Sequence, residues 1–105
     1  MAHSPARAPS MTRQEMIEQA RAMAPRFAAR AAAAEDARRI PAESVKDMLD
    51  AGLARILMPP RFGGCELGFD AWCDVVLEIS KADASHGWCA ALITHHCHMI
   101  AQFPE

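Results

Sequence analysis

Residues 85–103 are SHGWCAALITHHCHMIAQF, a stretch without a single Asp, Glu, Lys or Arg in a chain of 105 residues. Its large apolar side chains lie on all sides of the helix that it would form: Trp88, Leu92, Ile93, Met99, Ile100 and Phe103. A helix that is apolar on every side is typically a buried one. Because a domain of this size has a thin core, the stretch predicts a buried helix that needs a covering partner from outside the chain.

Helical periodicity also marks the beginning of the chain, starting at Thr12. Thr12 and Glu15 have the spacing of a capping box, in which each side chain satisfies a free backbone N–H. Pro25 lies inside this segment and predicts a kink or a division into two helices. The apolar residues behind the cap recur at helical spacing: Met16, Ala20, Met23, Phe27 and Ala31.

Two further helices are expected between these segments, and no stretch has the pattern of a strand. One begins at Pro41, where a missing N–H costs nothing, and ends at Gly52. A bent connector with inward-facing apolar residues follows over 53–64. The next helix spans about 69–83, and its predicted apolar face consists of Phe69, Trp72, Cys73, Val76 and Ile79. The sequence therefore predicts an all-α fold, a small up-and-down bundle of four to five helices.

Composition restricts the partners and the location of the protein. A net charge of −2 with mixed signs lacks the basic stripe of a nucleic-acid-binding protein. No run of about 18 uncharged apolar residues predicts a membrane span. Residues 1–11 are expected to be a disordered leader without a secretory signal. Four cysteines without a C-x-x-C pair then favour reduced thiols in a cytoplasmic protein.

The run His95-His96-Cys97-His98 is the most conspicuous group of reactive side chains. His95 and His98 are three residues apart and could supply two ligands to a metal, but no second pair has a matching spacing, so no metal site is predicted. Two interpretations stay open. The histidines are surface or hydrogen-bonded core residues, or one of them lines a ligand pocket as a hydrogen-bonding or acid–base group.

Ser85 and Trp88 also allow a structural and a functional interpretation. Ser85 has the residue type of a helix N-cap, and a helix N-terminus also suits an anionic or electron-rich ligand. Trp88 is either a core residue or the wall of a pocket for an aromatic ligand. Gly63-Gly64 permits close approach of the backbone but lacks the fingerprint of a nucleotide-binding loop.

Four strings resemble, in their order and spacing, the N-terminal helical domain of the acyl-CoA dehydrogenase-like flavoproteins. They are Arg39-Ile40-Pro41, Asp50-Ala51-Gly52-Leu53, Pro59-Pro60-Arg61-Phe62-Gly63-Gly64 and Ala82-Asp83-Ala84-Ser85-His86-Gly87-Trp88. Within that superfamily, the last string followed by a histidine further along the chain looks more like the reduced-flavin-dependent monooxygenases. These are oxygenase components of two-component systems that hydroxylate phenolic or polycyclic aromatic compounds.

The resemblance implies a site on this last helix. His96 matches by position the catalytic histidine that such enzymes place near the substrate and the flavin edge. Ser85, Trp88 and Leu92 would belong to the pocket for the small-molecule substrate, with Trp88 and Leu92 as apolar walls.

The resemblance also implies cofactors and partners. Reduced FMN or FAD would come from a separate flavin reductase, and the family members are usually tetramers. Residues 12–105 would be followed by a β-domain and a C-terminal helical bundle, which the sequence lacks. The chain alone is therefore expected to be inactive and to bind no flavin tightly, unless the missing domains or a complementing subunit completes it.

Two alternatives have different chemistry. In an acyl-CoA dehydrogenase proper, the domain would line the acyl-chain cavity and FAD would be tightly bound. A truncated, non-catalytic helical module would only dimerise or bind metal through its histidines.

Overall fold

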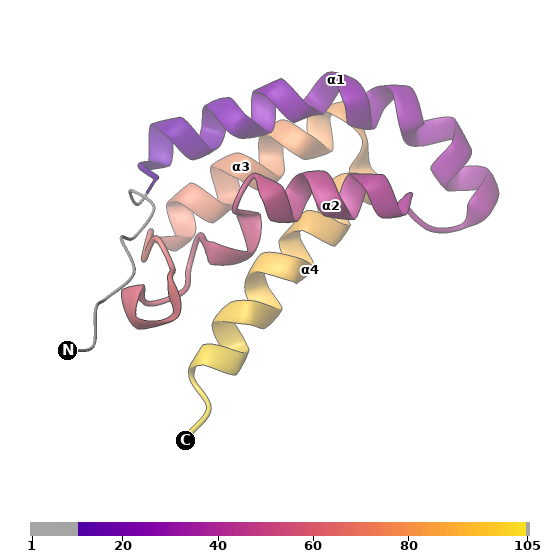
Figure 1. Ribbon diagram of the computed structural model, residues 1–105. Coiled ribbons are helices and arrows are strands. Elements are labelled where there is room, and N and C mark those ends of the chain that lie inside the picture. The colour runs from indigo at the N-terminus through magenta and orange to yellow at the C-terminus, as the bar shows by residue number, and fades with distance from the viewer. Residues whose placement is uncertain (1–10, 105) are drawn as a thin grey trace.

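The computed structural model describes residues 11–104, and within them it contains helices and no strand (Figure 1). The predicted all-α fold with four α-helices is confirmed. The predicted leader, apart from Met11, lies outside the described residues. None of the described helices combines the length and the apolar character needed to cross a membrane. The elements are α1 (Arg13–Ala37), α2 (Ala42–Asp50), η1 (Leu53–Arg55), η2 (Pro60–Phe62), α3 (Phe69–Ala82) and α4 (Ala84–Ala101).

Helix α1 begins with the predicted capping box. The Thr12 hydroxyl accepts a hydrogen bond from the Glu15 backbone N–H, and the Glu15 carboxylate accepts one from the Thr12 N–H, each at 3.1 Å. The predicted division into two helices at Pro25 is wrong, since α1 continues through it. Pro25 is exposed, while Met23 and Phe27 on either side of it are buried. Burial of this face holds together a helix that Pro25 deprives of one backbone hydrogen bond.

The segment after α2 folds back on itself, as its prolines and glycines predict. Gly52 has a φ of 85° and stops α2 in the left-handed conformation. The Cys65 N–H then donates to the Arg55 carbonyl at 2.8 Å. A Cβ on Gly64 would lie 2.0 Å from the Met58 carbonyl oxygen, so the chain needs a glycine at this close approach. The predicted inward-facing residues are buried: Leu53, Ile56 and Leu57.

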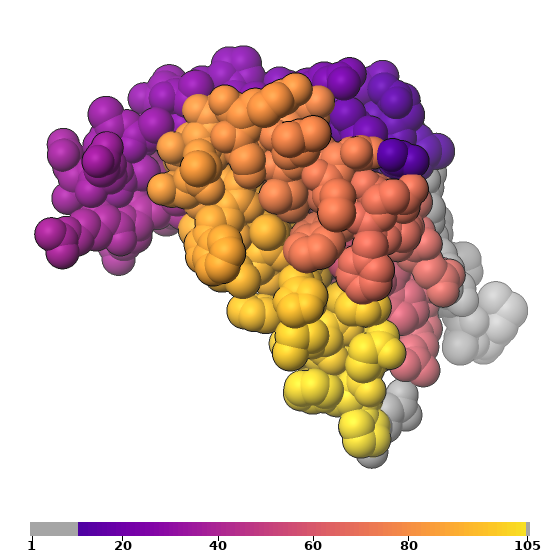
Figure 2. All heavy atoms as spheres, turned by 180° about the vertical axis from the view of Figure 1, so that it is seen from behind, coloured from indigo at the N-terminus to yellow at the C-terminus, as the bar shows by residue number. Residues whose placement is uncertain are grey.

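The core lies between α1, α3 and the segment that follows α2. Helix α3 buries a line of residues four apart, Ala71, Val75 and Ile79. The predicted apolar face of α3 is therefore only partly correct, because Phe69 and Cys73 are exposed. The smaller side chains face the core, which lets α3 pack close to α1 and leaves bulkier ones outside. Figure 2 shows α3 and α4 side by side at the surface, with the C-terminal end of α4 protruding beyond α3.

Candidate functional site

Helix α4 has two unlike faces, although no charged residue marks either of them. The side chains that it buries are small or polar: His86, Gly87, Ala90, Thr94 and Ala101. The opposite face carries residues that recur every three or four positions and share one side of the helix. We name them, together with Phe103 just beyond the C-terminal end of the helix, the outer stripe: Ser85, Trp88, Leu92, His96, Ile100 and Phe103.

The outer stripe is apolar and largely open to solvent. The side chains of Trp88, Ile100 and Phe103 are 67%, 62% and 63% exposed, while Leu92 is half-buried and His96 is exposed. Within the described chain α4 is therefore buried on one side only, and burial of the other side would need the outside partner that the sequence predicts. A core position for Trp88 is wrong. The face of α4 that packs against the rest of the chain carries mostly small residues. The large apolar side chains of the outer stripe lie on the other face and do not belong to the buried core of this chain. Contiguous exposed apolar surface of this kind is typical of a contact or ligand-binding face.

The N-cap of α4 is Asp83 and not Ser85, which corrects the structural interpretation of Ser85. The Asp83 carboxylate accepts a hydrogen bond from the His86 backbone N–H at 3.0 Å. Asp caps a helix as well as Ser does, and the helix begins two residues earlier than an N-cap at Ser85 would place it. The Ser85 side chain is consequently exposed and free of the capping role.

His86 is completely buried and joins Asp83 to Ser44 of α2. Its Nδ1 lies 2.5 Å from the Asp83 carboxylate, and its Nε2 lies 2.9 Å from the Ser44 hydroxyl. The ring also stacks on Phe27 of α1, with the ring centroids 4.6 Å apart. The order carboxylate, imidazole and hydroxyl is that of a hydrolytic triad. Because Ser44 has no exposed surface, no substrate can reach its hydroxyl, and the arrangement joins helices.

The acidic ends of this network are held in the charged form. Burial on its own would raise the pKa of Asp83, but the hydrogen bonds from the His86 ring and backbone N–H outweigh it and lower that pKa below the ordinary 3.8. At the other end, Arg30 of α1 donates to Ser44 and also to Asp47 of α2, and its hydrogen bond lowers the pKa of Asp47 below the same value. Both groups therefore bind protons more weakly in the folded state than in the unfolded state.

This difference predicts that the fold loses stability in acid. The stabilisation from Asp83 and Asp47 is present above their ordinary pKa of 3.8 and is lost as the pH falls through the lower folded values. We expect the melting temperature, followed by circular dichroism, to drop below about pH 4. The Asp83→Asn variant keeps an N-cap residue and should show a shallower drop. An unchanged pH profile in that variant would contradict the role given to the carboxylate.

Helices α3 and α4 meet along a seam of paired residues. Near their connection, Gly87 lies so close to Ser80 that a Cβ at residue 87 would be 1.9 Å from the Ser80 hydroxyl. Further along, the His95 ring stacks on Trp72 at 5.8 Å between centroids. Small residues at one end and rings at the other make the two helices diverge, as Figure 1 shows.

The contact between α3 and α4 also involves two of the three histidines of the run His95-His96-Cys97-His98. His95 stacks on Trp72, and the His98 ring meets Phe69 edge-on at 5.4 Å between centroids. Within the described residues, no three His, Cys, Asp or Glu side chains gather in a way that could hold a metal ion. Two of the three histidines thus pack against α3, and His96 alone of the three is on the outer stripe.

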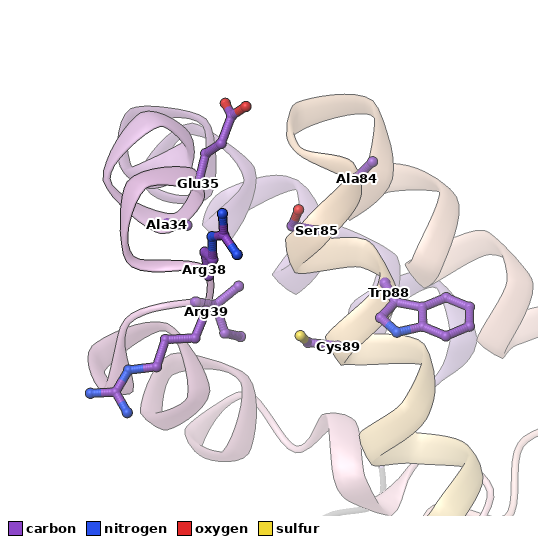
Figure 3. Close-up of a pocket in the computed structure, with 9 residues that line it drawn as sticks. Ala34, Glu35, Arg38, Arg39, Ala84, Ser85, Trp88 and Cys89 are labelled. Carbon is purple, nitrogen blue, oxygen red and sulfur yellow. The ribbon is translucent and has the colours of Figure 1, made fainter.

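A groove of about 640 Å³ separates the C-terminal end of α1 from the first turns of α4. Figure 3 shows the Ser85 hydroxyl and the Cys89 thiol on the side of α4 that faces Arg38, whereas the Trp88 ring points away from α1. Burial first, and the nearby Asp83 second, raise the pKa of the Cys89 thiol, which keeps it protonated and unreactive. Arg38 ends α1 in the left-handed conformation, with a φ of 58°.

The four predicted site residues are thus brought together as one helix face and not as one cavity. Ser85 lines the groove beside α1, and Trp88 borders it with its ring pointing away from α1. Leu92 and His96 follow one and two turns further along. The sequence did not predict that His86 is buried and hydrogen-bonded to Asp83 and Ser44. The one local signal for it was an Asp three residues before a His at the start of a helix, which is the spacing of an N-cap and its N3 residue.

Comparison with known proteins gives this arrangement a context. Residues 10–104 match the family described as acyl-CoA dehydrogenase, N-terminal domain. The oxygenase component of p-hydroxyphenylacetate 3-hydroxylase from Acinetobacter baumannii is 29% identical over 105 residues, which are 100% of this chain and 25% of that protein. The oxygenase component of an FADH(2)-dependent resorcinol hydroxylase from a Rhizobium strain is 32% identical over 105 residues, again 100% of this chain and 26% of that protein.

A third relative, a pigment production hydroxylase from a Rhodococcus strain, is 38% identical over 78 residues, which cover 74% of this chain and 20% of that protein. The chain thus spans about a quarter or less of the length of these curated relatives. No solved structure matches it significantly.

Proposed function

The chain belongs to the acyl-CoA dehydrogenase N-terminal domain family, and from this membership we propose that it forms the substrate-pocket domain of a reduced-flavin-dependent monooxygenase that hydroxylates an aromatic compound. The observation that carries the proposal is the outer stripe of α4, which is uncharged, exposed and rich in large apolar groups. Its relatives among the oxygenase components of aromatic hydroxylases support the same assignment.

The side chains of the stripe suit distinct roles toward an aromatic substrate. Trp88 and Leu92 would form apolar walls against its ring. His96 is the one ionisable side chain of the stripe, and it would hydrogen-bond the substrate hydroxyl and exchange a proton with it. Ser85, at the beginning of the stripe, would add a hydroxyl at the end of the pocket beside α1.

The residues present fit one wall of a flavin site and not a whole one. An apolar face with a single imidazole can lie against a ring system, but the described chain has no set of groups that would surround it. A reduced flavin, FMN or FAD, would supply the electrons that activate oxygen. In this proposal a separate reductase delivers it, and a β-domain and C-terminal helical bundle, within a homo-oligomer, provide its other contacts. We expect the 105-residue chain alone to be inactive.

The role of His96 is tested in an oxygenase whose N-terminal segment is this chain. With a flavin reductase and NADH present, we expect His96→Ala to lower the yield of hydroxylated product by a factor on the order of 100 and to divert oxygen into hydrogen peroxide. His96→Asn, which keeps a hydrogen-bonding group, should retain more of the product. The matched control is Lys46→Ala, which changes an exposed residue on α2. If His96→Ala behaves like that control, His96 has no part in the reaction.

The family also supports a second reaction, the desaturation of an acyl-CoA thioester with tightly bound FAD, because its description names acyl-CoA dehydrogenases. The same preparation distinguishes the two. Reduction of an electron acceptor by an acyl-CoA, without oxygen-dependent hydroxylation, would favour the dehydrogenase. Hydroxylation of a phenol that requires reduced flavin and oxygen would favour the monooxygenase.

A further inference from the structure

A continuous line of hydrogen bonds crosses the molecule beneath the candidate site. It starts at Asp83, passes through the His86 ring to the Ser44 hydroxyl, and continues to Arg30, whose guanidinium donates to Ser44 at 3.1 Å and to Asp47 at 2.8 Å. These residues belong to α4 and its cap, to α2 and to α1. One network therefore joins α4 to the two helices that begin the chain, α1 and α2.

The donors and acceptors of this network allow one assignment of protons for the neutral ring. A carboxylate only accepts hydrogen bonds and a guanidinium only donates them. The Asp83 carboxylate therefore takes the proton of His86 Nδ1, and Ser44 accepts from Arg30. The Ser44 hydroxyl is then free to donate to His86 Nε2. Every polar atom of the buried His86 and Ser44 side chains has a partner, so the ring is fixed in one tautomer and one orientation.

We propose that His86 is a positioning residue for the candidate site: together with Asp83 and Ser44 it fixes the first turn of α4. It thereby sets the positions of Ser85, which faces α1, and of Trp88, whose ring points away from α1. This inference rests on the proposed function in so far as Ser85 and Trp88 belong to the pocket. His86 itself touches no ligand, since its side chain has no exposed surface. It acts through the backbone that it shares with its neighbours.

The geometry supports this role in two ways. Ser85 immediately precedes His86, and Trp88 follows it by two residues, so any shift of the turn carries both side chains with it. The ring of His86 is also held on its flat side, where Phe27 stacks at 21° between the ring planes. The first turn of α4 is thus tied at the His86 ring edges, at its flat face and at its capped backbone N–H.

Removing the Ser44 hydroxyl tests the proposal without flavin or substrate. In a Trp72→Phe background the one remaining tryptophan is Trp88, so its fluorescence reports on the first turns of α4. We expect Ser44→Ala to shift this emission and to speed amide hydrogen exchange at residues 87 and 88 by about tenfold relative to the rest of α4. The matched control is Thr94→Val, which removes another buried hydroxyl that anchors α4, here to the Leu53 carbonyl at 2.9 Å.

A second variant, Asp83→Asn, keeps the proposal testable if Ser44→Ala does not fold. Asp83→Asn keeps a good N-cap but weakens the bond to His86 Nδ1, and we expect it to change the ring ¹⁵N shifts of His86 and the Trp88 emission. The proposal is overturned if Ser44→Ala or Asp83→Asn only lowers the melting temperature, as Thr94→Val does, and leaves Trp88 emission and local exchange unchanged. In the oxygenase, Ser44→Ala should raise KM for the aromatic substrate more than Thr94→Val does. The spectroscopic outcome stands apart from any failure of the proposed function.

Discussion

Replacing Gly87 with alanine is expected to cost about 3 kcal/mol of folding stability, the upper end of the range for overpacked sites. The added Cβ would lie 1.9 Å from the Ser80 hydroxyl, 2.8 Å from the Ser80 Cβ and 2.9 Å from the Ser80 Cα. Rotation of the serine side chain relieves the first contact but not the last, so α3 and α4 must move apart. For a domain of this size the melting temperature should fall by about 10–20 °C, as followed by circular dichroism.

A double variant separates steric conflict from the loss of glycine itself. Ser80→Gly removes the two side-chain atoms that Gly87→Ala would strike, so Ser80→Gly/Gly87→Ala should recover part of the lost stability. Ser80→Ala alone, which relieves contact without adding atoms, should change the melting temperature little. A melting temperature of Gly87→Ala close to that of the parent chain would show that the two helices are not held as tightly as their contact indicates.

Replacing His86 with alanine is expected to cost about 3–5 kcal/mol. The change removes the ring partner of the charged Asp83 carboxylate and of the Ser44 hydroxyl, which keep their bonds from the residue-86 backbone N–H and from Arg30, respectively. It also opens a cavity beside Phe27, on which the ring stacks. A cost of that size approaches the whole stability of a small domain, so most of the chain should be unfolded or close to unfolding. Urea denaturation of the chain, followed by far-ultraviolet circular dichroism, measures the loss.

His86→Phe divides this loss into its two physical parts. A phenyl ring fills most of the space and can still stack on Phe27, but it cannot accept or donate a hydrogen bond. Its remaining cost, about 1–3 kcal/mol, is that of leaving buried polar groups without partners. If His86→Phe is as stable as the parent chain, the network contributes nothing and the site requires only a ring.

The local part of the fold could be predicted from the sequence. The capping box at Thr12 and the left-handed stop at Gly52 are set by residues within a few positions of one another, so short-range rules suffice. The bond between His86 and Ser44 spans 42 positions, and no local pattern indicates it. The candidate residues on α4 could be selected from the sequence because they share one helix. The buried hydrogen bond between His86 and Ser44, which lies beneath them, could not be predicted.

Which face of α4 is exposed could not be predicted, because apolar content alone does not say which face turns inward. The inner face of α4 consists of residues such as Gly87 and Ala90, which allow a close approach at the expense of burying little area per residue. Trp88 remains outside for that reason. The amount of apolar surface can be read from the composition of the helix, whereas its packing depends on how side-chain size is distributed around the helix.

The contact between Gly87 and Ser80 also fixes the angle at which α4 leaves α3, so a small change there displaces the far end of α4. From Gly87 to Ala101 the helix extends about 20 Å, so tilting it by about 5° at this contact would move its far end by about 2 Å, the scale of one methylene or two. The width available to a ligand beside His96 would then depend on the size of residues a full two turns away. Substitution of a small residue at this contact, such as Ser80, could therefore adapt the site to a substrate of another size. No residue of the outer stripe would have to change.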